Sequence, residues 1–171
     1  MHSPDELICL SYCSTASFEA APRSFGVDPQ VIRILIESRR YNRHHRIGGV
    51  LQFGNGCFFQ YLEGPTDVVD QLYARICRDT RHFDVRRLTR RPIVSRRFEY
   101  WSMKFVAIDR VVAEVLRRHD LHCFDPYQFT PAIIDDMVVS CIHPPDEAPE
   151  ADPEPHAPRA RKSLWRRLVG G

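Results

Sequence analysis

The sequence predicts an α+β fold, a ferredoxin-like sandwich in which two helices cover one face of a five-stranded mixed sheet. Short apolar runs bounded by turn residues alternate with segments whose apolar residues recur every three or four positions. The resulting order is strand, helix, two strands, helix, two strands, which is typical of this sandwich. Two further helical segments follow, and we expect their apolar stripes to cover the other face of the sheet.

The first part of the chain supplies a strand, a loop and a helix. Residues 7–12 form an apolar run that predicts a strand, and residues 13–28, rich in Ser, Ala, Gly and Pro, predict a loop. Asp28 and Pro29 indicate a helix start, because an acidic cap and a proline both suit the first turn. The inward stripe of this helix, with members three or four residues apart, consists of Val31, Ile34, Leu35, Ser38 and Asn42.

The remaining elements begin with a hairpin. Strands at 47–53 and 57–62 are joined by Gly-Asn-Gly, which is a strong hairpin signal. Thr66 is predicted to cap the helix that follows. The later segments are predicted as strands at 88–94 and 100–106 and helices at 111–118 and 131–141.

Composition limits the domain organisation and the function classes. The chain has 171 residues, of which 43% are hydrophobic, so one domain with its own core and an extension fit. A net charge of +2 gives the whole molecule no strong electrostatic bias. We expect a domain at 1–110, a helical extension at 111–142, and at 143–171 a proline-rich acidic linker with a basic amphipathic end, which suits a partner or surface contact.

The six cysteines include no C-x-x-C pair, which argues against a zinc ribbon. Several lie in apolar patterns, where a free thiol acts as a small hydrophobe, and this favours a reducing compartment. His44 and His45 lack further ligands at a workable spacing, so no metal site is expected. Without a visible signal peptide or a run long enough for a membrane span, we expect a cytoplasmic protein.

Three polar side chains are predicted to point into an apolar layer. Gln60 lies within an apolar strand, Tyr12 ends the first strand, and Asn42 continues the inward stripe of the first helix. In this sandwich the first and third strands are neighbours, so the phenol and the two amides converge. They form either a pocket for a flat heteroaromatic ring with polar edges or a small network of core residues that satisfy one another.

Six separated segments of the chain resemble the BLUF domain, a family of blue-light receptors that bind FAD. The resemblance runs from about residue 6 to 108 and implies a short stand-alone photoreceptor. The segments, in the family's order, are 10–14 (LSYCS), 38–42 (SRRYN), 47–51 (IGGVL), 58–65 (FFQYLEGP), 79–82 (DTRH) and 98–103 (FEYWSM).

The resemblance implies a role for each matching residue. Tyr12 matches the tyrosine that donates an electron and then a proton to the excited flavin. Gln60 matches the glutamine that lies between this tyrosine and the flavin and changes its hydrogen bonds. Asn42 matches the asparagine that bonds the ring edge. Ser38, Tyr41, Arg75, Asp79, Arg81 and His82 complete the expected cofactor site, and Trp101 and Met103 match a signal-relay pair on the fifth strand, either of which could face Gln60.

The chain departs from the family pattern at two of these segments. Gly48 stands in place of a threonine, and we expect this to loosen the entrance to the strand. Tyr41 stands where the family commonly has Asn or His against the ring, and the loop at 13–28 is longer than usual. These departures bear on flavin affinity and kinetics.

The sequence shows neither paired carboxylates nor a nucleophile with a nearby base, which would indicate catalysis. We therefore expect a signalling protein that acts through a partner and as a homo-oligomer.

One alternative remains open. Six arginines at 86–97 and the aromatic residues at 58–61 are compatible with a flavin-free module that binds RNA or an acidic protein through an arginine-rich edge. The unbroken apolar run argues against RNA, because a stacking platform alternates with charged residues.

Overall fold

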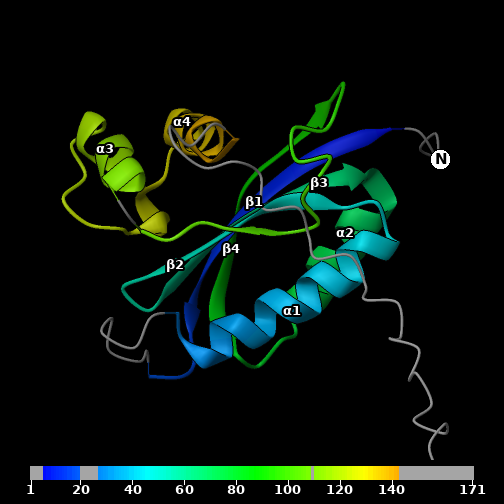
Figure 1. Ribbon diagram of the computed structural model, residues 1–171, viewed down its shortest axis with the longest axis horizontal. Helices are drawn as coiled ribbons and strands as arrows, with labels where there is room; N and C mark the ends of the chain where they lie inside the picture. Colours follow the sequence, from blue (N-terminus) through cyan, green and yellow to red (C-terminus); the bar gives the residue numbers. More distant parts are fainter. Residues whose placement is uncertain (1–5, 20–26, 109, 143–171) are drawn as a thin grey trace, which may run out of the picture.

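The computed structural model describes residues 6–19, 27–108 and 110–142. Its elements, in chain order, are β1 (Leu7–Ala16), α1 (Pro29–His44), β2 (Gly48–Gly54), β3 (Cys57–Pro65), α2 (Thr66–Ile76), β4 (His82–Ile93), β5 (Lys104–Phe105), α3 (Arg110–Arg118), the 3-10 helix η2 (Pro126–Gln128) and α4 (Pro131–Ile142). Helices α1 and α2 lie on one side of the sheet, and α3 and α4 lie on the other (Figure 1). The predicted α+β sandwich is confirmed.

The five strands form one sheet in the order β4-β1-β3-β2-β5. The first four strands pair antiparallel, whereas β5 runs parallel to β2, which makes the sheet mixed. Strands β1 and β3 are neighbours at the centre, as the sequence predicts, and their register sets Tyr12 directly opposite Gln60. Because cross-strand partners point to the same face, the two side chains meet on the α1 and α2 side.

The sheet is buried on both faces, which explains why β3 is apolar without alternation. On one face Leu10, Leu51 and Leu62 pack with Val31 and Leu35 of α1. The other face carries an apolar cluster shared with the C-terminal helices, which includes Phe59, Tyr61, Phe98, Val112, Leu116, Ile134 and Met137. The aromatic residues of β3 are therefore core side chains and offer no exposed platform on which bases could stack.

The prediction of a loop from residue 13 onward is wrong, because β1 continues to Ala16. Cys13, Ser14 and Thr15 pair with the start of β3, and β4 pairs along the other side of the same segment. Strand β4 also begins at His82, six residues before its predicted start. Pairing on two sides stabilises the strand at 13–16, where Thr15 is the one residue type that favours a strand by itself.

The fifth strand is much shorter than predicted. Only Lys104 and Phe105 pair with β2, so Trp101 and Met103 lie in the segment before β5 and not within a strand. This segment is held in place by hydrogen bonds with side chains elsewhere in the protein, and not by strand pairing. The buried Glu63 carboxylate accepts a hydrogen bond from the Phe98 backbone N–H, and Asn42 donates to the Ser102 carbonyl.

Two expectations about single residues are also wrong. Thr66 does not cap α2 with its side chain, since its Oγ1 donates to the Glu6 carbonyl at 2.8 Å. Gly48 does not loosen the entrance to β2. A Cβ atom at this position would lie 2.4 Å from the Phe98 carbonyl oxygen, so glycine allows the two backbones to pack closely.

The edge strand β4 carries four of the six arginines predicted to flank it, Arg86, Arg87, Arg90 and Arg91. Three of them are neutralised by aspartates, in the pairs Arg86–Asp84, Arg90–Asp70 and Arg91–Asp135. Such pairing leaves less charge for a phosphate backbone.

Within the described ranges, no helix combines the length and apolarity that a bilayer crossing requires. Residues 143–171, predicted as linker and amphipathic end, lie outside the described residues.

Candidate functional site

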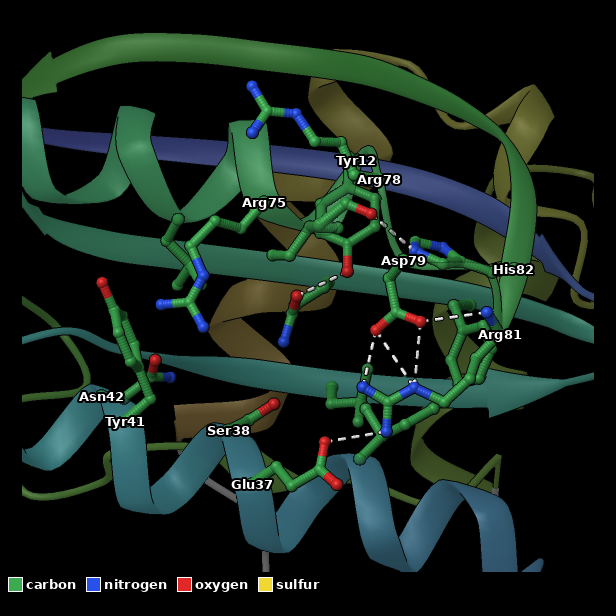
Figure 2. Close-up of a pocket in the computed structure, with 16 residues that line it drawn as sticks. Tyr12, Glu37, Ser38, Tyr41, Asn42, Arg75, Arg78, Asp79, Arg81 and His82 are labelled. Carbon is green, nitrogen blue, oxygen red and sulfur yellow. Dashed lines mark hydrogen bonds and ion pairs between the residues drawn. The ribbon is translucent and has the colours of Figure 1, made fainter.

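A cavity of about 310 Å³ lies between the sheet and helices α1 and α2 (Figure 2). The sequence-predicted site residues come from five elements and the turn before β4, and the fold brings all nine to the lining of this cavity. They are Tyr12, Ser38, Tyr41, Asn42, Gln60, Arg75, Asp79, Arg81 and His82. The cavity volume falls within the range of about 300–1,000 Å³ that is usual for ligand sites.

Tyr12 and Gln60 form a direct, buried hydrogen bond. The Tyr12 hydroxyl donates to Gln60 Oε1 at 2.6 Å, and the two residues are 5% and 3% exposed. Burial raises the pKa of Tyr12 far above its ordinary value, and the negative charge of Asp79 raises it further. The phenol therefore remains protonated at physiological pH and keeps its role as the donor in this bond.

Of the two predicted relay residues, Met103 is the one that faces the cavity side. Its Sδ accepts a hydrogen bond from Gln60 Nε2 at 3.4 Å, and its side chain is 1% exposed. Trp101 packs with the opposite cluster, where its ring centroid lies 6.2 Å from that of Phe98. The sequence left both placements open, and the structure assigns Met103 to the Gln60 side and Trp101 to the α4 side.

Asn42 reaches the cavity from α1 as the periodicity predicts. Its Nδ2 donates to the Ser102 carbonyl at 2.7 Å. Its Oδ1 is buried and, among the described residues, has no hydrogen-bond partner. Because Asn42 also lines the cavity, this acceptor suits a ligand there that carries an N–H or O–H donor.

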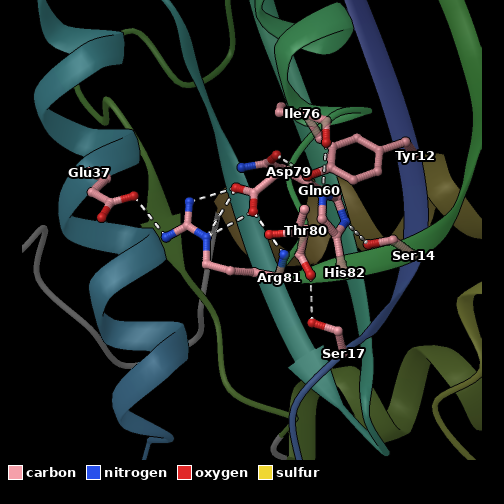
Figure 3. A network of polar contacts seen from close by, with 10 residues as sticks. All are labelled: Tyr12, Ser14, Ser17, Glu37, Gln60, Ile76, Asp79, Thr80, Arg81 and His82. Atoms are coloured by element: carbon pink, nitrogen blue, oxygen red, sulfur yellow. Dashed lines mark hydrogen bonds and ion pairs between the residues drawn. The ribbon is translucent and has the colours of Figure 1, made fainter.

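An ion-pair network forms the polar rim of the cavity (Figure 3). Asp79 binds the Arg81 guanidinium at 2.6 Å, and the hydrogen bond from Arg81 holds the pKa of Asp79 below its ordinary value. Arg81 also pairs with Glu37 of α1 at 2.8 Å, which links the turn before β4 to α1. His82 contacts the Ile76 carbonyl at 2.9 Å, which joins the start of β4 to the last turn of α2.

Arg75 and Tyr41 form a cation–π pair at the cavity. The guanidinium carbon lies 4.5 Å from the centroid of the Tyr41 ring.

Sequence reasoning missed several lining residues, although Phe58 could have been found, because it lies two positions before Gln60 and shares its face of the sheet. The missed residues are Ile34, Glu37, Leu51, Phe58, Leu72, Ile76 and Arg78.

Curated relatives match about a third of the chain. The blue light- and temperature-regulated antirepressor BluF of Escherichia coli is 38% identical over 61 residues, which are 36% of this chain and 15% of the relative. The photoactivated adenylate cyclase subunit beta of Euglena gracilis is 43% identical over 63 residues, which are 37% of this chain and 7% of the relative. The matches thus span only a small part of these longer proteins.

Solved structures match most of the chain. BlsA in its photo-activated state has a TM-score of 0.73 and 26% identity, over 84% of this chain and 99% of that one. BlrB, described as a BLUF protein in its dark state, has a TM-score of 0.64 and 29% identity, over 82% and 98%. The family model for sensors of blue-light using FAD matches residues 7–104, and the chain therefore belongs to the BLUF family of FAD-dependent blue-light photoreceptors.

Proposed function

We propose that the flavin ring of FAD binds in the cavity between α1, α2 and the sheet, and that Tyr12 and Gln60 form the light-sensitive switch. The observation that carries this proposal is the 2.6 Å hydrogen bond from Tyr12 to Gln60. Both residues line the cavity together with the other sequence-predicted residues. Trp101 and Met103, on opposite faces of the sheet, lie where a change at Gln60 can be passed onward.

The residues present suit FAD. The unpartnered Oδ1 of Asn42 suits the imide N–H at the edge of the flavin ring. Arg75 and Arg78 bring positive charge to the cavity lining, which suits the pyrophosphate of the cofactor. Ser38, Tyr41, Asp79, Arg81 and His82 would hold the remaining polar edges.

FAD, when bound, supplies the blue-light absorption and an excited state that accepts an electron. Tyr12 is a buried, oxidisable side chain at the cavity, and its O–H proton lies on a direct path to Gln60 Oε1. Because the site is buried, this proton has one protein acceptor among the described residues. The pair is thus suited to a local electron and proton transfer.

Met103 distinguishes the two orientations of the Gln60 amide. In the structure Gln60 presents its oxygen to Tyr12 and its nitrogen to Met103. A reversed amide would turn its oxygen toward the thioether sulfur, which has no proton to donate. We infer that rotation of the amide breaks the contact with Met103 and shifts the segment that carries it.

The output is proposed to pass through a partner protein or another copy of this chain, without catalysis by the chain itself. The helical extension at 111–142 would carry the signal, because its helices cover the face opposite the cavity. All six cysteines are free thiols, which supports a reducing, cytoplasmic setting. The oligomeric state and the location stay predictions.

An absorption spectrum before and after blue light tests the proposed function. Purified protein is expected to be yellow, with flavin bands that shift red under illumination and return in the dark. A colourless protein, or flavin bands that do not respond to light, would contradict the proposal. A colourless protein that binds oligonucleotides with a strong dependence on salt would instead favour the flavin-free alternative.

Asn42→Ala is expected to weaken FAD binding about 5- to 20-fold, because it removes one buried hydrogen bond to the ring. Fluorescence titration of the apoprotein with FAD measures the affinity. Asn55→Gly is the matched control. It removes an amide that donates to the Phe124 carbonyl outside the cavity, and glycine tolerates the positive φ of this position. Equal affinities for both variants would contradict the assignment of Asn42.

A further inference from the structure

Lys104 links the segment beside the cavity to the last turn of α4. Its Nζ donates to the Cys141 carbonyl at 3.1 Å and lies 5.0 Å from the centroid of the Trp101 ring. Carbonyls in the last turn of a helix lack partners within the helix, and a cation is favourable at this end of the helix dipole. The lysine therefore stabilises the C-terminal turn of α4 where it docks on the sheet.

The residues just before Lys104 are held from the cavity side. Asn42 donates to the Ser102 carbonyl at 2.7 Å, Arg39 Nε donates to the Met103 carbonyl at 2.9 Å, and Gln60 contacts Met103 Sδ. Met103 belongs to the cluster on the α1 and α2 side, whereas Lys104 reaches Cys141 on the other side. One peptide bond joins the two residues, so a displacement of Met103 is passed to Lys104.

The last turn of α4 is held by both apolar and polar contacts. Cys141 belongs to the apolar cluster of this face and also accepts a hydrogen bond from the side chain of Gln52. Gln52 is fully buried, donates only to the Cys141 sulfur at 3.5 Å, and its Oε1 has no partner among the described residues. The ends of a helix open more readily than its interior, so the last turn of α4 responds to the loss of one polar contact.

We propose that Lys104 is the positioning residue that couples the flavin cavity to the C-terminal turn of α4. In the dark it holds the Cys141 carbonyl. In the light, loss of the contact between Gln60 and Met103 shifts the segment at 102–104, withdraws Lys104 and loosens the last turn. The inference rests on the proposed function and identifies where the signal leaves the sensor.

Hydrogen–deuterium exchange of the full chain with FAD, in the dark and under blue light, tests this role. In the wild type, illumination is expected to speed exchange in the peptide spanning 137–142 about fivefold, the effect of losing one hydrogen bond. Lys104→Met is expected to exchange fast in the dark and to show no further increase in the light. Lys104→Arg, which keeps a donor, should restore the difference between dark and light.

The matched control is Arg91→Met, which removes the ion pair with Asp135 and so frees α4 from β4 without touching the cavity segment. This variant is expected to speed exchange in α4 while it keeps the response to light. A light response in Lys104→Met equal to that of the wild type would overturn the role of Lys104, as would a wild type whose last turn ignores light.

The absorption spectrum, recorded on the same samples, separates this inference from the proposed function. Lys104→Met is expected to keep the light-induced red shift, because its side chain lies on the opposite face from the cavity. A wild type without a red shift would overturn the proposed function itself. A normal red shift with no effect of Lys104→Met on exchange would overturn only the coupling.

Discussion

Gln60→Leu is expected to abolish the light-induced red shift while FAD stays bound. Leucine fills a similar volume but has neither the acceptor for Tyr12 nor the donor for Met103 that the amide supplies. No group remains whose reorientation changes a hydrogen bond beside the flavin. The buried Tyr12 hydroxyl also loses its acceptor, so the free energy of unfolding should fall by about 1–3 kcal/mol.

The light-minus-dark difference spectrum checks this expectation, with flavin content measured on the denatured protein. Gln52→Leu is the matched control, since it replaces a glutamine that is equally buried but faces α4. It removes an oxygen that has no partner in the described part of the chain, so stability should hold or rise. A normal red shift in Gln60→Leu would contradict the proposed switch.

Tyr12→Phe is expected to eliminate photoconversion and to raise flavin fluorescence. A phenyl ring is much harder to oxidise than a phenol, and it has no proton to pass to Gln60 Oε1. Because electron transfer from the phenol competes with emission, its removal leaves more of the absorbed light as fluorescence. Steady-state fluorescence and the difference spectrum measure the two effects on the same sample.

Tyr73→Phe is the control for that variant. The Tyr73 ring lies 5.7 Å from the Tyr12 ring, centroid to centroid, yet Tyr73 is absent from the cavity lining. It should retain the red shift, and equal losses in both variants would contradict a special role for Tyr12. If Tyr12→Phe still photoconverted, the hydroxyl would not be the source of the transferred proton.

The pKa of Tyr12 predicts how the switch depends on pH. Burial raises this pKa, so the phenol stays neutral and the amplitude of the red shift should be constant between about pH 6 and 9. The sign for stability follows from the same shift. Below the ordinary tyrosine pKa, the neutral phenol makes its full contribution to the free energy of unfolding. This contribution decreases as the pH rises above about 10, because there the unfolded chain ionises and the folded chain does not.

Much of the candidate site could be predicted from the sequence. The helical spacing that begins at Val31 placed Asn42 on the inward face, and an amide within an apolar strand marked Gln60. The family motif at 79–82 supplied Asp79, Arg81 and His82, and the resemblance as a whole added Arg75, which local periodicity could not. The fold then brought these residues to one cavity.

Local patterns in the chain were enough to establish the order of the elements and the faces on which Tyr12, Asn42 and Gln60 lie, because backbone periodicity is a local property. The end of β1, the two-residue length of β5 and the opposite placement of Met103 and Trp101 emerged only in three dimensions. These features depend on pairing and packing between residues far apart in the chain. The contact of Lys104 with Cys141 spans 37 positions and is of the same kind.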